Sequence, residues 1–395
     1  MIRLYMVHIW EVLLKVLFVT LDKCPNIDAG AVRTHMIAKM FIDNHHDVTV
    51  ISMGPYNNEK VIAVDGVKYI SFRPKTDFFI NKVLAYSLFS FKLGRFLINK
   101  SYDVCCHTQL DTATLKMLKR YSIKHNASIV YDAVEWFSPE QFKRGASSHK
   151  YKLNNNYNTC YITNEHKVIS ISSYLDVNFR KRGVSSLLMP VVLDMKNIPY
   201  KKNCQGKKRN IIYAGMPGKK DYLDVIIKGM RLLTSEERSR IHFTIIGCTK
   251  EQFLASTELN SEEFVQVEDC MDFLGRIPRE SVMYNYANTD FSILVRPKKA
   301  RYAQAGFPTK LVESLATATP VICNYTSDIS QYIKHLKNGV IVQGEDEYAC
   351  AEALRCIIKL KRETVVEMQK NARNTAEKYF DYRLFSDKVV EFVKG

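Results

Sequence analysis

Two successive series of short β-branched segments, each followed by an amphipathic segment, constrain the fold of this 395-residue chain more than any other feature. In the first series we expect strands at Val16–Thr20, Asp47–Ser52, Val67–Phe72, Val104–Cys106, Ile129–Tyr131 and Val168–Ile171, with helices at Arg33–Asn44, Thr112–His125 and Ser173–Arg182. In the second we expect strands at Ile211–Ala214, Phe243–Ile246, Phe291–Val295, Val321–Asn324 and Val340–Val342, with helices at Tyr222–Leu233, Arg279–Tyr286, Pro308–Thr317 and Glu347–Leu360. Buried strands that alternate with helices are typical of parallel sheets. The pattern predicts an α/β protein with two doubly wound, Rossmann-like domains.

The polar, basic stretch YKKNCQGKKRN (200–210) separates the two series and is the best candidate for an interdomain linker. We therefore expect an N-terminal domain at 1–199, a C-terminal domain at 211–378 and a terminal helix at 379–395. Apolar residues at helical spacing predict that this last helix packs on a domain surface, with a return to the N-terminal domain as one option. Because ligands of doubly wound sheets bind beyond the carboxyl ends of the strands, the site is expected in a cleft between the domains.

The composition is that of a globular protein with a basic surface. Its net charge of +16 favours an anionic partner, such as a nucleotide, a nucleic acid or an acidic membrane face, although a merely soluble basic surface is the simple alternative. The ten cysteines form neither a CxxC pair nor a zinc-binding pattern, which favours reduced thiols and a cytoplasmic location. Glu11 and Lys15 interrupt the apolar N-terminal run, so we expect neither a signal peptide nor a membrane span there.

The stretch AGFPTKLVESLATATPVI, beginning at Ala305, carries the clearest chemical signal. Gly306 permits a tight turn and Pro308 suits the start of a helix, whose free amides and dipole attract phosphate. Lys310 adds a positive charge, and the Glu313 carboxylate can accept hydrogen bonds from a ribose diol. Together these features suggest a nucleotide. The alternative is a solvated ion pair between Lys310 and Glu313, three positions apart on a helix.

This stretch resembles the signature of GT-B glycosyltransferases, specifically the retaining family 4 (glycosyltransferase group 1). Gly306 and Phe307 match the family's loop, and Glu313 matches a glutamate that binds the ribose of the sugar nucleotide. The resemblance places Gly306, Phe307, Pro308, Thr309 and Lys310 around the diphosphate. Ala305 departs from the family, which usually has a glutamate there that contacts the donor sugar.

The likeness extends along most of the chain. In IIYAGMPGKKDYLDVIIKGMRLL, Gly215 would permit close approach to the diphosphate, and either Lys219 or Lys220 would neutralise it, unless this is only a solvated basic turn. The turn containing Arg276 and Ile277 would meet the base through its backbone. The resemblance also implies donor-phosphate contacts for Gly30 and the neighbouring Arg33. Arg296 would touch phosphate or sugar, or is a surface arginine.

On the acceptor side, the resemblance draws attention to two strand ends. His107 follows one of them, although a lone histidine is more often structural than catalytic. Asp132 and Glu135 close the other, similar to an Asp-x-x-Glu pattern of the family, and Glu135 is the stronger acceptor-side candidate. The segment 78–100 is basic and apolar with no acidic residue, so it suits either an anionic membrane face or an ordinary core helix with extended lysines.

Other enzyme classes lack support. There is no GxGxxG, GxxxxGK[ST] or GxSxG motif, which argues against dinucleotide enzymes, P-loop NTPases and α/β-hydrolases. There is no DxD pair of the kind that holds a metal in the other major transferase fold, so we expect no metal and no cofactor besides the nucleotide sugar.

The residues together with the resemblance predict a metal-independent glycosyltransferase that uses a nucleotide-sugar donor. The resemblance implies a retaining reaction, a saccharide or lipid-linked acceptor and a setting in bacterial surface polysaccharide synthesis. We expect a location in the cytoplasm or at the inner face of the cytoplasmic membrane, with no nucleic-acid partner. The alternatives are another GT-B sugar-nucleotide enzyme (an epimerase or hydrolase), a degenerate transferase and, remotely, a basic nucleic-acid-binding protein.

Overall fold

The computed structural model describes residues 13–25, 28–54, 61–72, 79–200, 206, 208–216, 220–257, 259 and 261–395, with only the backbone described for 79–87 and 261. Lys219, most of the expected linker and the start of the segment 78–100 lie outside the described residues. The chain forms two compact units, which are described one at a time: Met1–Tyr131 with Ser386–Gly395, and Asp132–Phe385. The expected limits of domains and linker stay predictions.

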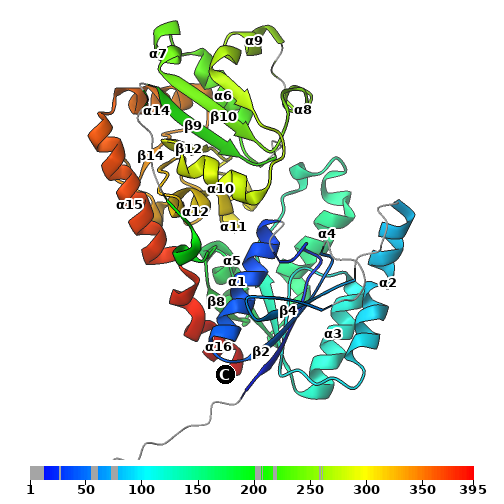
Figure 1. The fold of residues 1–395 in the computed structure, drawn as a ribbon. Helices are drawn as coiled ribbons and strands as arrows, with labels where there is room; N and C mark the ends of the chain where they lie inside the picture. The colour runs from blue at the N-terminus through cyan, green and yellow to red at the C-terminus, as the bar shows by residue number, and fades with distance from the viewer. Residues whose placement is uncertain are drawn as a thin grey trace, which may run out of the picture. The chain divides into compact units, whose positions relative to one another are not determined.

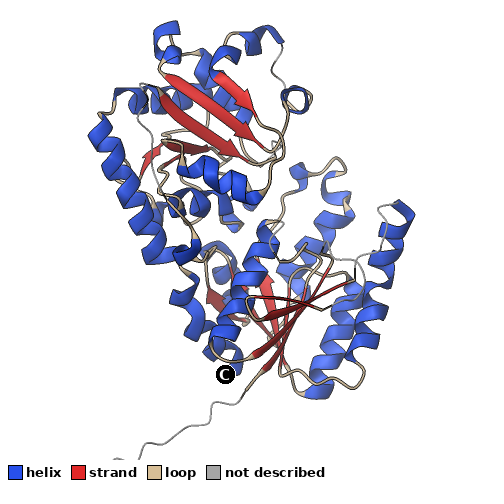
Figure 2. Ribbon diagram, viewed as in Figure 1, coloured by secondary structure: helices blue, strands red, loops and turns tan. Residues whose placement is uncertain are grey.

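The strands form two sheets, and helices cover both faces of each (Figures 1 and 2). The first has the order β3-β4-β2-β1-β5-β6-β7-β8 and the second the order β11-β10-β9-β12-β13-β14. The strands of the first are β1 Lys15–Val19, β2 Asp47–Ser52, β3 Ile62–Val64, β4 Val67–Ser71, β5 Val104–His107, β6 Ser128–Ala133, β7 His166–Ser170 and β8 Ser185–Leu188. Those of the second are β9 Arg209–Ala214, β10 Ile241–Ile246, β11 Met271–Phe273, β12 Phe291–Leu294, β13 Val321–Cys323 and β14 Gly339–Ile341. Strands β3 and β4 pair antiparallel, whereas β9 and β10 pair parallel like the rest of the second sheet. The predicted α/β class with parallel sheets is confirmed.

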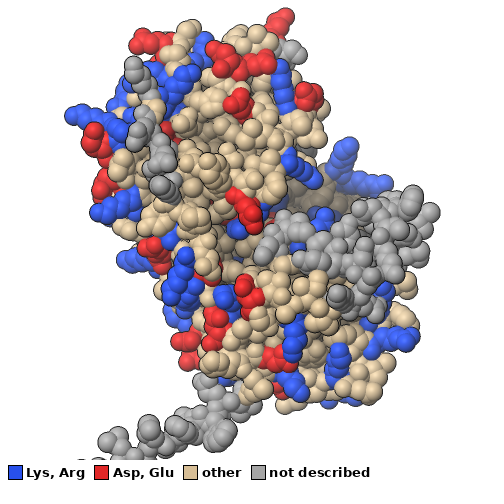
Figure 3. Space-filling model, in the orientation of Figure 1, with Lys and Arg blue, Asp and Glu red and all other residues tan. Residues whose placement is uncertain are grey.

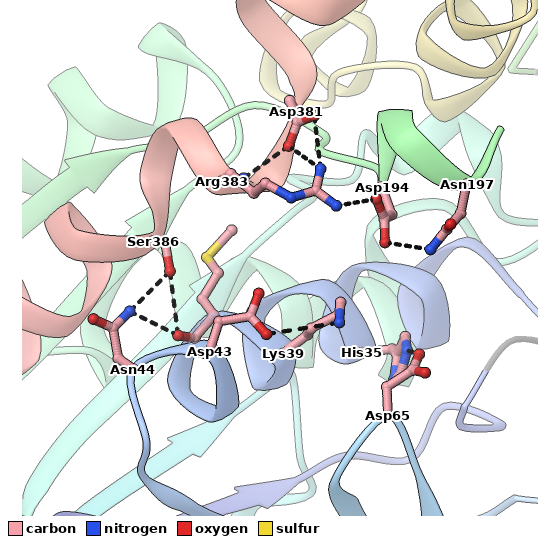
Figure 4. A network of polar contacts seen from close by, with 11 residues as sticks. His35, Lys39, Asp43, Asn44, Asp65, Asp194, Asn197, Asp381, Arg383 and Ser386 are labelled. Carbon is pink, nitrogen blue, oxygen red and sulfur yellow. Dashed lines mark hydrogen bonds and ion pairs between the residues drawn. The ribbon is translucent and has the colours of Figure 1, made fainter.

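The first unit contains the helices α1 Ala29–Asp43, α2 Phe79–Leu97, α3 Thr112–His125 and α16 Ser386–Lys394. Aspartates fix the start of two of them, since Asp28 caps the amide of Ala31 in α1 and Asp111 caps α3. The terminal helix α16 packs on α1, where the Asn44 amide donates hydrogen bonds to Ser386 Oγ at 2.9 Å and to a backbone carbonyl (Figure 4).

In the second unit, alternate side chains of β9 enter two different cores. Ile211 and Tyr213 pack with α6 and α14, whereas Ile212 and Ala214 pack against Tyr286 of α10. This period of two puts helices on both faces, as a doubly wound sheet requires. The helices of this unit are α4 His149–Asn156, α5 Ser173–Lys181, α6 Leu223–Arg231, α7 Ser235–Ser239, α8 Lys250–Leu254, α9 Ser261–Val265, α10 Arg279–Ala287, α11 Arg301–Ala305, α12 Thr309–Ala316, α13 Ile329–Tyr332, α14 Glu347–Lys359 and α15 Arg362–Phe380.

The long helix α15, for which no helix was predicted, packs on α12 through an apolar face that ends at Phe380. Just beyond it, Arg383 forms ion pairs with Asp381 and Asp194 (Figure 4). These contacts fix the chain where it leaves α15.

The surface bears charges of both signs. Lys and Arg side chains lie among Asp and Glu side chains over the visible face rather than in one patch (Figure 3). In α2, Phe89 and Leu93 are fully buried, while Phe91 is 65% exposed, so one side of this helix is core and another carries exposed apolar groups. No helix within the described ranges has both the length and the apolarity needed to cross a bilayer. Membrane contact by 78–100 stays a prediction.

Candidate functional site

The candidate site is built at the carboxyl edge of the second sheet. Gly215 follows β9, Arg296 comes two residues after β12, and α12 brings in Lys310 on its first turn. Because these strands are parallel, their ends meet along one edge. Residues that are distant in sequence therefore converge there.

Asp221 organises this convergence. It accepts hydrogen bonds from Arg296 Nε at 2.9 Å and from the Tyr213 hydroxyl at 3.0 Å, and it forms an ion pair with Lys310 Nζ. Lys310 also donates to the Tyr213 hydroxyl at 3.0 Å. Only 4% of the Asp221 side chain is exposed, against 26% for Lys310. These four residues are called the Asp221 cluster below.

The contacts within the cluster favour the charged forms of Asp221 and Lys310. Burial alone would raise the pKa of Asp221, but Lys310 and Arg296 hold it well below its usual range. Burial lowers the pKa of Lys310, and Asp221 opposes that shift. Two cations and one carboxylate leave one excess positive charge at the sheet edge. The cluster can therefore serve as an anion site.

Glycines make room for this arrangement. A Cβ on Gly215 would overlap Lys310 Nζ, so no other residue fits beneath the lysine without displacing it. Gly247 lies beside it with a φ of +116°, and a Cβ there would collide with the carbonyl of Gly215. The end of β9 thus depends on two glycines in close contact.

Glu313, on the second turn of α12, pairs with Arg279 at the start of α10. Its Oε1 accepts from Arg279 Nη2 at 3.0 Å, and 15% of the glutamate side chain is exposed. Burial raises the pKa of Glu313, and Arg279 counters this. Lys310 points to Asp221 instead, so the alternative of a simple Lys310–Glu313 surface pair does not describe the observed contacts.

Glu135 and Lys220, predicted for opposite substrates, form an ion pair with each other. Their side chains are 38% and 45% exposed, respectively, so the pair is open to solvent. The Lys220 ammonium also lies 5.6 Å from the Phe137 ring. Asp132, three residues before Glu135, is 7% exposed.

The loop before α12 is mostly buried. Phe307 is 5% exposed and packs against Tyr332 and Phe380, with ring centroids 5.5 and 5.8 Å away. Pro308 precedes α12, and no side chain caps its first amides, beginning at Thr309. Ala305 is fully buried, and its carbonyl accepts a 2.6 Å hydrogen bond from Ser172 Oγ. Gly306 follows directly, with its amide bonded to the Tyr302 carbonyl.

The turn predicted to meet the base is formed as a left-handed glycine turn. Gly275 has a φ of +63°, and its carbonyl accepts from the Gly247 amide at 2.7 Å. Arg276 is exposed and touches Met216 Sδ at 3.8 Å, while Ile277 packs against the core beneath α10.

The remaining predicted residues lie in the first unit. His107 Nδ1 donates to the Thr108 carbonyl at 2.8 Å, and burial lowers its pKa to about 4, which leaves the ring neutral at pH 7. A Cβ on Gly30 would lie 2.6 Å from the Asp22 carboxylate, which explains glycine there. Arg33 is 3% exposed within α1.

Asp221, Tyr213 and Arg279 were not predicted from the sequence. Asp221 directly follows the lysine pair Lys219–Lys220, and nothing local distinguishes it from a solvated turn residue. Among the described residues, no group of three His, Cys, Asp or Glu side chains is placed to hold a metal ion. The expectation of a metal-free reaction stays a prediction.

Comparison with known proteins agrees with this geometry. The family model "Glycosyl transferases group 1" matches residues 194–375. The putative colanic acid biosynthesis glycosyltransferase WcaL of Escherichia coli (strain K12) is 24% identical over 185 residues, which are 47% of this chain and 45% of WcaL. The amylovoran biosynthesis glycosyltransferase AmsK of Erwinia amylovora is 26% identical over 132 residues, which are 33% of this chain and 31% of AmsK. The matched segments thus span less than half of either relative.

Solved structures of other proteins are similar to this chain over almost its whole length. Sucrose-phosphate synthase from Thermosynechococcus elongatus superposes with a TM-score of 0.74 at 13% identity, covering 96% of this chain and 98% of that one. Anabaena HepE in complex with UDP-glucose gives a TM-score of 0.67 at 14% identity, covering 96% and 99%. The resemblance seen in the signature stretch is thereby confirmed. The chain has the GT-B fold, and its residues 194–375 are similar to the group 1 glycosyl transferases.

Proposed function

We propose that this protein is a glycosyltransferase that moves a sugar from a nucleotide-sugar donor to a saccharide or lipid-linked acceptor. The observation that carries the proposal is the Asp221 cluster, which holds Lys310 and Arg296 at the carboxyl edge of a group 1 transferase sheet. Its excess positive charge suits the diphosphate of such a donor. Stabilisation of the departing diphosphate is the main electrostatic task of the reaction.

The contacts support the following binding roles. The uncapped amides at the start of α12 and the Lys310 ammonium would bind phosphate oxygens, with Arg296 beside them. Glu313, held by Arg279, would accept hydrogen bonds from the ribose diol. The backbone turn at Gly275, with Arg276 and Ile277, would meet the base.

The reaction would proceed with retention and without a metal. The acceptor hydroxyl would attack the anomeric carbon on the face from which the diphosphate leaves. The bond between that carbon and the phosphate oxygen breaks, and the leaving phosphate takes up the acceptor proton. The Lys310 ammonium would balance the charge that develops on the leaving group. Glu135, Asp132 and His107 are the acceptor-side candidates.

The relatives support a setting in bacterial polysaccharide synthesis, since WcaL and AmsK are named for colanic acid and amylovoran biosynthesis. A cytoplasmic location, with contact to the inner membrane face through 78–100, suits a lipid-linked acceptor. Ala305 keeps open the alternative of a degenerate transferase, because it offers no carboxylate to the donor sugar.

The test is thermal stabilisation by a panel of UDP-, GDP-, dTDP- and CMP-sugars, with Glu313→Ala alongside. A ligand at 100 times its Kd adds about 2.7 kcal/mol to the free energy of unfolding. We expect one base to give a selective shift that the variant loses. A folded protein that responds to none of them would contradict the proposal.

A further inference from the structure

A second site lies outside the Asp221 cluster, in a groove of about 530 Å³ within the second unit. Its walls include Trp136 after β6, Tyr174, Val177 and Lys181 of α5, and Gln304 and Asp328. This set is called the Trp136 groove below. None of these residues has a role in the donor site described above.

The aromatic wall of the groove is fixed before any ligand arrives. Trp136 Nε1 donates to Asn155 Oδ1 at 3.1 Å, and the Arg301 guanidinium stacks 4.7 Å from the Trp136 ring. Tyr174 meets Trp136 edge to face, with centroids 6.1 Å apart. Tyr174 and Val177 nevertheless remain 43% and 47% exposed. Rigid aromatic groups that stay partly open offer contact area at little entropic cost.

The polar wall is similarly fixed. Asp328 Oδ2 accepts from the Ser173 amide at 2.7 Å, and Gln304 Oε1 accepts from the Ser327 amide at 3.1 Å. The Lys181 side chain, in contrast, makes no ion pair or hydrogen bond with any described residue. The groove thus presents a carboxylate, an amide and an ammonium beside two aromatic rings.

The groove is physically connected to the loop of the donor site. Ser172 Oγ, which accepts from the Leu175 amide at the start of α5, also donates to the Ala305 carbonyl. Gln304 and Ala305 are the last two residues of α11, directly before Gly306, and α11 lies against α5 (Figure 1). A ligand in the groove would therefore lie beside the segment that leads to Lys310.

We propose that the Trp136 groove binds a pyranose unit of the acceptor saccharide, an inference that rests on the proposed transferase function. A pyranose has an apolar C–H face, which suits Tyr174 and Trp136, and a rim of hydroxyls that both donate to Asp328 and accept from Lys181. An apolar helix would desolvate the Lys181 ammonium without giving it a partner, and would leave the remaining acceptor capacity of Asp328 unused. A nucleotide would require more than the single cation that Lys181 supplies.

The chain offers a direct probe, because it contains two tryptophans, Trp10 and Trp136. In a Trp10→Phe background, emission from Trp136 is titrated with methyl β-D-glucopyranoside, methyl β-D-galactopyranoside, methyl β-D-glucopyranosiduronate and p-cresol. We expect a saturable change with at least one glycoside, and about tenfold weaker binding in Tyr174→Ala. Tyr348→Ala, which removes a tyrosine that is 69% exposed on α14, should bind as the parent does.

The titrations either support or overturn the proposed pyranose site. A response to the glucuronide alone that Lys181→Met abolishes supports a pyranose site for an acidic sugar. A response to p-cresol but to no glycoside overturns it, as does no saturable response or binding unchanged in Tyr174→Ala. The sugar-nucleotide panel on the same variants separates the two proposals. Glycoside binding without any nucleotide response would preserve the groove and remove the transferase function, and the reverse would remove only the groove.

Discussion

Replacing Asp221 by asparagine removes the charge that holds Lys310 and Arg296 together in the proposed donor site. The change keeps the shape of the side chain but removes the carboxylate that bridges Lys310 and Arg296. Removal of one partner from a buried ion pair typically costs about 3–5 kcal/mol, because the other charge is left uncompensated. Lys310 keeps 26% of its side chain exposed and can reach water, so we expect the lower end, about 3 kcal/mol.

The loss should depend on pH with a definite sign. Burial lowers the pKa of Lys310 in the folded protein, and without Asp221 nothing in the cluster opposes it. The unfolded chain then binds more protons than the folded one, so the free energy of unfolding of the variant rises as the pH increases toward the usual lysine range. The deficit relative to the parent should therefore shrink at high pH.

Anions should rescue the variant, because the charge at the sheet edge changes from one excess positive charge to two. We expect pyrophosphate to stabilise Asp221→Asn more than it stabilises the parent. Urea unfolding at several pH values, with and without pyrophosphate, measures all three effects. Asp224→Asn, a change three residues later in the first turn of α6, is the matched control. A loss below about 1 kcal/mol, similar to that of a surface substitution, would show that Asp221 does not hold the two cations in place.

Three further predictions follow from the described contacts. Glu313→Gln should lower kcat/KM by about 100-fold through weaker ribose binding, whereas Glu280→Gln, at an exposed position of α10, should leave kcat/KM unchanged. Equal effects of the two variants on kcat/KM would contradict this. Gly215→Ala should weaken nucleotide binding, because the added Cβ displaces the Lys310 ammonium, as calorimetric titration would reveal; unchanged binding would contradict this. The folded-state pKa of His107, about 4, lies below its unfolded value. Its stabilising contribution of about 3 kcal/mol is therefore present above the unfolded pKa and is lost as the pH falls toward 4. In His107→Leu, the free energy of unfolding should depend less on pH over that range, and an unchanged pH profile would contradict this.

Most strands were predictable, because a buried parallel strand appears in the sequence as a short run of consecutive apolar residues. The range Asp47–Ser52 was predicted as a strand and is β2, and Thr112–His125 was predicted as a helix and is α3. The strands β3, β8 and β11 were not predicted, because they are short and only partly buried. The equally short β13 and β14 were predicted, because each is a fully buried apolar run. The start of α1 at Ala29 is set by the Asp28 cap, four residues before the amphipathic pattern indicates.

The site was predictable only where its residues are contiguous. The signature stretch indicated Lys310 and Glu313, but not that each would find its partner elsewhere. Arg279 lies 34 residues before Glu313, and Asp221 lies 89 residues before Lys310. Such pairs are made by the topology of the sheet, which brings strand ends together, and no local spacing encodes them.

The central claim is that the Asp221 cluster and Glu313 bind a nucleoside diphosphate without a metal. Isothermal titration calorimetry in the presence of EDTA tests it most directly, with the nucleoside diphosphate selected by the sugar-nucleotide panel. We expect binding that persists in EDTA, is weakened by about 10- to 100-fold in Lys310→Met, and is also weakened in Glu313→Gln. Binding that disappears in EDTA, or that both variants leave unchanged, would contradict it.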